Sequence, residues 1–155
     1  AHNTVLAASN STKFTIFLPS KEKRRLQEKF RKVGYPRLFI DYVFAALLYI
    51  LLTQSKQSSF IIDTEYTGHG KTIEDLLKFA LKNKTIVWKQ IGKNSPAHDL
   101  AYKTFAKKLK ANLVVDAKMI WDLITKKAGG RLNTGLSPAN RRSDPSYYSH
   151  INKKR

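Results

Sequence analysis

From residue 60 onward, short apolar runs alternate with segments of helical periodicity, and this alternation constrains the fold more than any other feature of the chain. Three runs, at residues 60–62, 85–91 and 113–115, have the length and composition of buried strands. The segment between the first two runs carries apolar side chains at helical spacing, and these are Ile73, Leu76, Leu77, Ala80 and Leu81. Strands that alternate with amphipathic helices are typical of βαβ units, in which the strands run parallel.

The first part of the chain predicts a strand and two helices. Residues 13–18 place apolar side chains at alternate positions, as a half-buried strand does. Residues 21–33 have the periodicity of an amphipathic helix, which Gly34 ends. Residues 38–52 are apolar on nearly every face, but they include Asp41 and would reach only about 22 Å as a helix, short of the roughly 30 Å hydrocarbon core of a membrane. We therefore expect a buried helix here rather than a membrane span.

Taken together, these elements predict an α/β fold with the order β-α-α-β-α-β-α-β-α and a single, mainly parallel sheet. We assign this domain to residues 13–128, with residues 1–12 as a flexible N-terminus. In the helix that Ser95 and Pro96 begin, the inward positions are expected to be Ala97, Ala101, Phe105 and Leu109. Residues 129–155 are rich in Gly, Ser, Pro, Asn and Arg, which predicts a basic flexible tail.

The charge of the chain restricts its partners. There are 29 lysines and arginines against 11 aspartates and glutamates, which gives a net charge of +18. Such a charge points to nucleic acid, an anionic membrane surface or an acidic protein. The chain has no cysteine, so disulfides, thiolate zinc sites and a cysteine nucleophile are excluded. With no secretory signal visible at the N-terminus, we expect a cytoplasmic or nucleoid-associated location.

The basic residues are grouped along the sequence. Residues 76–110 hold nine lysines against Asp99 alone. The turn before residue 96 resembles a phosphate cradle at a helix N-terminus, although an ordinary capped turn has the same composition. The residues expected to contact nucleic acid are Lys93, Asn94, Ser95, Lys103, Lys107 and Lys110, the last three on one helical face, with Arg24, Arg25 and Arg31 on the earlier helix. Lysine predominates over arginine in the later group, which favours contact with the phosphate backbone.

Aromatic residues accompany these lysines. The candidates for stacking on bases are Trp88, Tyr102 and, in the tail, Tyr147 and Tyr148. The alternative for Trp88, which lies in a predicted strand, is a place in the core.

Acidic residues stand at the predicted strand ends. Asp63 and Glu65 follow the first apolar run, and Asp116 follows the last. The carboxyl ends of parallel strands meet at one edge of a sheet, where Asp63 and Glu65 could share Mg²⁺ or Mn²⁺, with Asp116 as a candidate third carboxylate. The alternative is structural, with Asp63 capping the loop, Glu65 paired with a basic residue and Asp116 capping the following helix.

The sequence Phe-Ile-Ile-Asp-Thr-Glu-Tyr-Thr-Gly at residues 60–68 resembles the first acidic motif of the DEDD exonucleases. The order of strand, Asp63, helix and strand over residues 60–93 also resembles the region of the second catalytic aspartate in DDE transposases. Both families have the ribonuclease H-like fold, so the resemblance implies a ribonuclease H-like sheet, with a Rossmann-like sheet as the alternative. It implies a metal-binding role for Asp63, and for Glu65 from the exonuclease comparison alone.

We therefore predict a nucleic-acid-binding α/β protein that contacts the phosphate backbone through a lysine-rich face. One alternative is a Mg²⁺- or Mn²⁺-dependent nuclease or transposase-like phosphodiesterase, with Asp63, Glu65 and Asp116 as its catalytic residues. Another is an RNA-binding structural subunit of a ribonucleoprotein. The choice between DNA and RNA, the question of catalysis and the oligomeric state stay open at this point.

Overall fold

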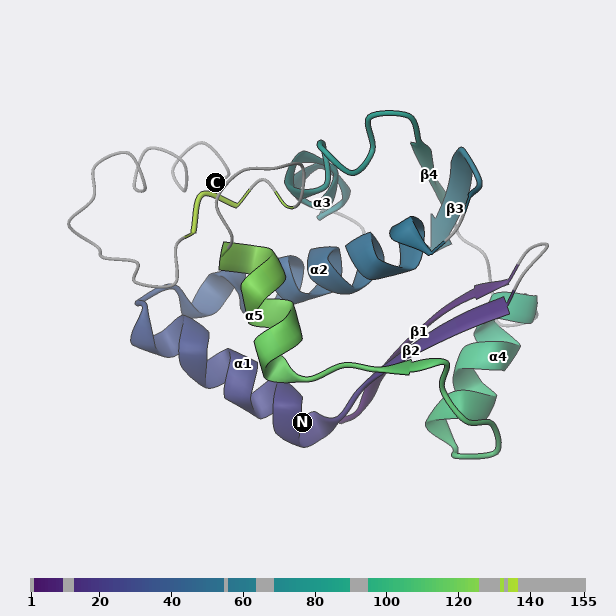
Figure 1. The fold of residues 1–155 in the computed structure, drawn as a ribbon, viewed down its shortest axis with the longest axis horizontal. Coiled ribbons are helices and arrows are strands. Elements are labelled where there is room, and N and C mark those ends of the chain that lie inside the picture. Colours follow the sequence, from purple (N-terminus) through teal and green to yellow (C-terminus); the bar gives the residue numbers. More distant parts are fainter. Residues whose placement is uncertain are drawn as a thin grey trace.

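The structure is a computed structural model that describes residues 2–9, 13–54, 56–63, 69–89, 95–125, 132 and 134–136. Over these residues the chain is a mixed α/β protein (Figure 1). The strands are β1 (Thr4–Ser9), β2 (Lys13–Leu18), β3 (Ser59–Asp63), β4 (Thr85–Lys89) and β5 (Leu113–Val114). The helices are α1 (Ser20–Lys32), α2 (Phe39–Thr53), α3 (Gly70–Leu76), α4 (Pro96–Phe105) and α5 (Ala117–Thr125), with a short 3-10 helix (Pro36–Leu38) before α2. From β2 to α5 the order is the one predicted.

Helix α1 is amphipathic and ends at a glycine turn, as predicted. Leu26 and Phe30, one turn apart, are completely buried. Gly34 has a φ of 88°, in the left-handed region that glycine adopts without strain. Its N–H donates to the carbonyl oxygen of Arg31 (3.0 Å), and the N–H of Tyr35 donates to that of Phe30 (2.9 Å). These two hydrogen bonds close the helix in a Schellman turn.

Helix α2 forms the centre of the core, which confirms the prediction of a buried helix at residues 38–52. Eleven of its 15 residues are buried. The segment Pro36–Thr53 is long and apolar enough to cross a membrane by length and composition alone, and 56% of it is buried inside the fold. The ring of Phe30 on α1 packs edge-on against Tyr42 of α2 and against Trp121 of α5, so three helices meet at this side chain.

The described strands form two sheets, so the prediction of one sheet is wrong, although two of the three strand pairings are parallel as predicted. In the first sheet β1 is antiparallel to β2, and β2 is parallel to β5. In the second sheet β3 is parallel to β4. Strand β1 lies within residues 1–12, which we expected to be flexible. Its residues pair with β2 along their whole length, with Leu6 opposite Ile16 and Ala8 opposite Phe14.

Strand β5 pairs with β2 because α4 carries the chain back to the first sheet. Helix α4 packs against β1 and β2. Asn112, directly before β5, then contacts Thr15 in β2. The Oδ1 atom of Asn112 accepts hydrogen bonds from the backbone N–H (2.9 Å) and the hydroxyl (3.1 Å) of Thr15, and the hydroxyl oxygen accepts one from the N–H of Asn112 (3.0 Å). This contact fixes Leu113 opposite Ile16.

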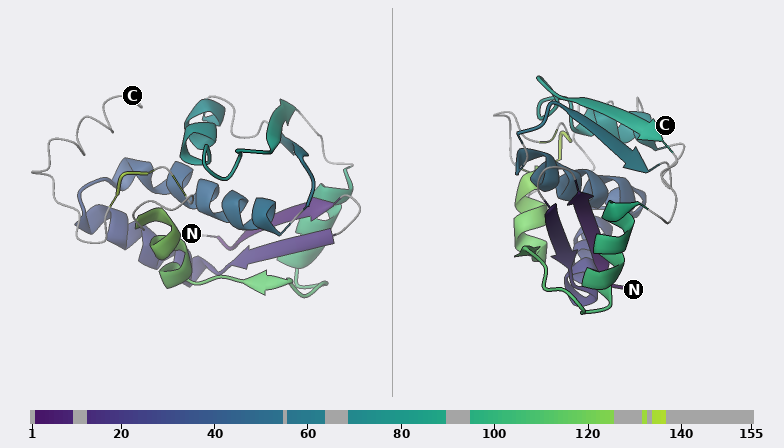
Figure 2. Two further views of the ribbon diagram at one scale, coloured as in Figure 1. Left: turned by 45° about the horizontal axis from the view of Figure 1, so that its top comes forward. Right: turned by 90° about the vertical axis from the view of Figure 1, so that its right-hand side faces the viewer.

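Helix α2 lies between the two sheets, with β3, β4 and α3 on one side and the three-stranded sheet on the other (Figures 1 and 2). The inward side chains of α3, Ile73 and Leu76, are completely buried, and α3 packs against α2. This helix begins at Gly70 and ends at Leu76, well before Leu81, the last apolar residue of the predicted helical periodicity.

Trp88 belongs to this packing, in agreement with the alternative expectation that its side chain packs in the core. The indole lies against Gly70, where a Cβ atom would come within 3.1 Å of Cε2. Its Nε1–H donates to Oε1 of Glu74 (2.7 Å). Trp88 therefore joins β4 to the start of α3.

The boundary of the tail needs correction. Leu132, Thr134 and Leu136 are buried, although we placed the start of a flexible tail at residue 129. The hydroxyl of Thr134 donates to the carbonyl oxygen of Ile124, at the end of α5. Two leucines within a polar segment thus return to the core. The other residues after 125 lie outside the described part of the chain.

Candidate nucleic-acid interface

The predicted basic residues that the structure describes fall on two separate surfaces. Arg24, Arg25 and Arg31 lie on α1, and Lys103, Lys107 and Lys110 lie on α4 and the turn that follows it. Helices α1 and α4 stand at different ends of the molecule (Figures 1 and 2). The structure therefore does not join them into one face.

The start of α4 shows how Ser95 is used. Its Oγ atom accepts a hydrogen bond from the N–H of His98 (3.1 Å), which caps the helix. Pro96 occupies the first helical position, as predicted. Ser95 is thus the cap of an ordinary helix start, while Lys93 and Asn94 lie outside the described residues.

The end of α4 differs from the prediction. Lys103, Lys107 and Lys110 were placed on one helical face, but the helix ends at Phe105. The N–H of Lys107 donates to the carbonyl oxygen of Thr104 (3.1 Å), and the N–H of Lys108 donates to that of Lys103 (2.8 Å). These bonds form a Schellman turn, in which Lys107 has a φ of 60°. A residue with a Cβ atom adopts this conformation at a cost of roughly 1–2 kcal/mol.

The side chains of α4 also face differently from the prediction. Phe105 and Leu109 were expected to point inward, but they are 45% and 43% exposed. The buried residue is Thr104, whose hydroxyl donates to the carbonyl oxygen of Leu100 (2.8 Å). Because the inward residue is a polar threonine, the hydrophobic periodicity of the sequence places the larger Phe105 on the inner face of the helix instead.

Exposed aromatic and basic side chains therefore share the end of α4. Tyr102 is 57% exposed, and Nζ of Lys108 lies 5.8 Å from the centroid of its ring. Lys103 is paired with Asp99, with 3.0 Å between Nζ and Oδ2. We call the following exposed residues the α4 surface: Tyr102, Lys103, Phe105, Lys107, Lys108, Leu109 and Lys110. Of these, Lys108 and the exposed face of Phe105 were missed in the sequence, where the pairing of lysines and aromatics in residues 102–110 was the available signal.

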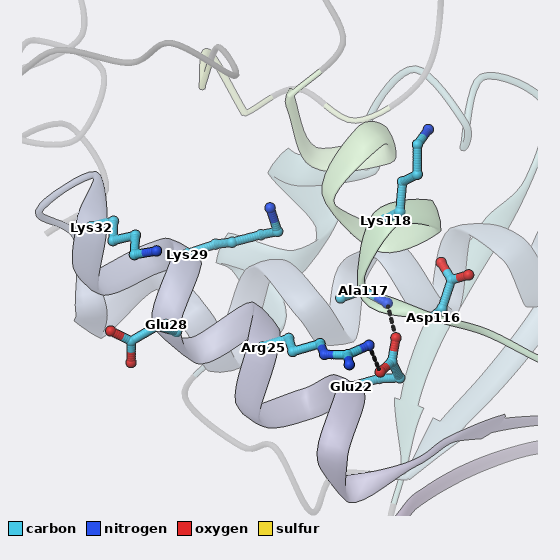
Figure 3. A pocket seen from close by; sticks show the side chains of 8 residues that line it. All are labelled: Glu22, Arg25, Glu28, Lys29, Lys32, Asp116, Ala117 and Lys118. Carbon is cyan, nitrogen blue, oxygen red and sulfur yellow. Dashed lines mark hydrogen bonds and ion pairs between the residues drawn. The ribbon is translucent and has the colours of Figure 1, made fainter.

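The basic residues of α1 face a pocket of about 440 Å³ between α1 and the start of α5 (Figure 3). Arg25, Lys29 and Lys32 line it from α1, and Lys118 lines it from α5. Acidic side chains line it as well, and these are Glu22, Glu28 and Asp116. With both signs of charge in its walls, this pocket is not a selective anion site.

Glu22 joins the two helices at this pocket. Its Oε2 atom lies 2.7 Å from Nη1 of Arg25, and its Oε1 atom accepts a hydrogen bond from the N–H of Ala117 (3.2 Å) (Figure 3). The carboxylate, which is almost completely buried, satisfies a free N–H at the start of α5.

Asp116 caps a helix, which is the role expected as the alternative to metal binding. Its Oδ1 atom accepts a hydrogen bond from the N–H of Met119 (2.8 Å), so it caps α5. It follows β5 in the first sheet, whereas Asp63 ends β3 in the second. The prediction that Asp116 shares a sheet edge with Asp63 is therefore wrong, because β5 does not pair with β4.

Asp63 lies at the carboxyl end of β3, in register with Lys89 at the end of β4. Glu65 lies outside the described residues. Within the described part of the chain, no group of three histidine, aspartate or glutamate side chains is arranged to hold a metal ion. Asp116, which lies in the other sheet, is therefore not part of a common site with Asp63 at one sheet edge, and metal binding by Asp63 and Glu65 stays a prediction.

Comparison of the chain with protein-family models finds no match. Comparisons with curated proteins and with solved structures find no significant match either. The ribonuclease H-like resemblance stays a prediction, and the function has to be inferred from the surfaces described above.

Proposed function

We propose that the protein binds nucleic acid by contacting phosphates through the lysines of the α4 surface. The observation that carries this proposal is the density of exposed positive charge there. Four lysines, at positions 103, 107, 108 and 110, are exposed within eight residues, and Asp99 is the only acid on α4. Each lysine that neutralises a phosphate releases a counterion, which favours binding irrespective of base sequence.

The arginines of α1 are a weaker candidate, because acidic neighbours on the same helix pair with two of them. Arg25 lies 2.7 Å from Glu22, and Arg31 lies 3.5 Å from Glu28. On the α4 surface, one of the four lysines, Lys103, is paired with an acid in this way, and that acid is Asp99. In addition, none of the large hydrophobic side chains exposed in the described residues belongs to α1.

A salt titration tests the proposal. Affinity for a nucleic acid should fall linearly with salt on a double-logarithmic plot, with a slope set by the number of phosphates contacted. Replacing the four lysines of the α4 surface by glutamine should flatten this slope by about 3. The same four-fold replacement at Lys56, Lys71, Lys82 and Lys118, which are also exposed, lowers the net charge equally and serves as the control.

Two results would overturn the proposal. One is the absence of binding to either single-stranded or duplex nucleic acid at about 50 mM salt. The other is an equal loss of slope in the two four-lysine variants, which would show that net charge rather than this surface determines affinity. Co-purification with a single RNA species would identify the protein as a structural subunit of a ribonucleoprotein that binds through the same lysines.

A second candidate function is a phosphodiesterase of ribonuclease H-like type, and the β3–α3–β4 unit favours it. This unit consists of two parallel strands joined through a helix, with Asp63 at a carboxyl end beside Lys89. Such strand ends are where α/β sheets place their ligand sites. A ribonuclease H-like or Rossmann-like assignment rests on this unit alone. Abolition of Mg²⁺- or Mn²⁺-dependent cleavage by Asp63→Asn, with binding retained, would support it, and equal cleavage by wild type and variant would exclude it.

A further inference from the structure

Two aromatic rings on the α4 surface are left in water although they stand on a packed helix. Tyr102 and Phe105 are 57% and 45% exposed, and they are three residues apart, so they lie on the same side of α4. The residue between them that packs inward is Thr104. The exposed part of each ring contributes nothing to the core, and a flat apolar surface at this position is suited to a flat partner.

Positive charge lies close to these rings. Nζ of Lys108 lies over the ring of Tyr102. Lys107 and Lys110 stand on either side of Lys108 in the sequence, in the turn after the helix. Lys107 keeps a left-handed backbone conformation that glycine would adopt without strain. The chain therefore accepts a local backbone cost at a position that carries a cation on this surface. Residues held in such conformations cluster at binding sites.

We propose that the α4 surface binds single-stranded nucleic acid, with unpaired bases stacked on Tyr102 and Phe105 and phosphates held by the surrounding lysines. This proposal rests on the proposed function and adds the class of ligand. In a duplex the faces of the bases are covered by neighbouring base pairs, so exposed rings gain nothing there. In a single strand each base offers a free face, and a base stacked on an aromatic ring contributes affinity irrespective of sequence.

The test measures binding of the full chain to labelled oligothymidylate and oligouridylate of about 12 nucleotides. Tyr102→Ala and Phe105→Ala should each lower affinity about 10-fold while the salt slope stays unchanged, because no charge is removed. Tyr102→Phe and Phe105→Tyr keep a ring and should keep the affinity. Phe105→Leu keeps an apolar side chain but has no ring, so its affinity should fall as it does in Phe105→Ala.

Phe79 provides a matched control. It is also 45% exposed, and Nζ of Lys78 lies 5.3 Å from its ring. It comes shortly after α3 in the chain, and α3 and α4 lie on different sides of α2 (Figures 1 and 2). Phe79→Ala should leave affinity unchanged. Because about half of each ring is exposed, the three variants should stay folded at the temperature of the binding assay, which a thermal melt checks.

Three outcomes would overturn the inference while leaving nucleic-acid binding in place. They are full affinity in Tyr102→Ala and Phe105→Ala, an equal loss in Phe79→Ala, and binding to a duplex of the same length as tight as to the single strand. Binding to polyglutamate as tight as to oligothymidylate would show that the surface recognises negative charge in an acidic polypeptide, and this too would contradict base stacking. Failure to bind any nucleic acid would instead refute the proposed function.

Discussion

Lys107 occupies at the end of α4 the position that Gly34 occupies at the end of α1. Both residues have a positive φ, 60° and 88°, and both stand in a Schellman turn with the same hydrogen-bond pattern. Lysine in this conformation is strained by its Cβ atom. We expect Lys107→Gly to raise the free energy of unfolding by about 1 kcal/mol, measured by urea denaturation, and Gly34→Ala to lower it by a similar amount.

The same Lys107→Gly variant should bind nucleic acid less tightly, because it loses one cation of the α4 surface. A variant that is more stable and yet a weaker binder would separate the two roles of this position. Unchanged affinity together with higher stability would show that the strained lysine serves no binding purpose.

Gly70 should not tolerate a side chain, because the indole of Trp88 lies against it. The Cβ of an alanine would come within 3.1 Å of Cε2, and the hydrogen bond to Glu74 restrains the indole from moving aside. We expect Gly70→Ala to destabilise the protein by about 1–2 kcal/mol in urea denaturation, despite the better helix propensity of alanine. In a Trp88→Phe background, which removes the contacting atoms, the same substitution should become neutral or stabilising. A loss of equal size in both backgrounds would contradict this explanation.

Glu22 and Glu28 offer a matched pair of substitutions, since both lie on α1 and both pair with an arginine three residues later. Glu22 is buried and also accepts a hydrogen bond from the N–H of Ala117. Glu22→Ala leaves this N–H without its partner, so we expect a loss of about 2 kcal/mol. Glu28→Ala breaks an exposed pair and should change stability by less than about 0.5 kcal/mol. Equal effects of the two substitutions in chemical denaturation would show that Glu22 does not hold α5 in place.

The segment after α5 should contribute to stability through its two buried leucines. Leu132→Ala and Leu136→Ala are each expected to cost about 2–4 kcal/mol. A chain that ends at Arg131 lacks both side chains and should melt at a lower temperature than the full protein. A chain that ends at Ser137 keeps both and should melt close to the full protein, because the sequence beyond offers little apolar area. Equal melting of the two shortened chains would show that the leucines do not belong to the core.

The helices with their own periodicity and the parallel pair of β3 and β4 could be predicted from the sequence, whereas the pairing of β1 and β5 with β2 could not. Leu26 and Phe30 mark the inner face of α1 by their spacing, and Gly34 marks its end. By contrast, β5 contains only two residues, and its partner is fixed by a contact between Asn112 and Thr15 across 97 positions of the chain. Strand β1 is half-buried at every position and shows no period-two pattern.

The same distinction applies to the candidate site. The charges of Lys103 and Lys107 were visible in the sequence, but their arrangement was not. A lysine in a left-handed turn gives no signal in the sequence, whereas a glycine there does. The end of α4 was therefore placed too late, and with it the direction of Phe105.

The position of α2 between the two sheets has a consequence for how the protein opens. Within the described chain, β3 and β4 pair only with each other, and α3 ties them to the rest by packing its side chains on α2. Backbone hydrogen bonds unite β1, β2 and β5 separately. The β3–α3–β4 unit can thus unfold as one block while the first sheet stays intact. Amide protons of β3 and β4 should then exchange with solvent deuterium together, and earlier than those of β2.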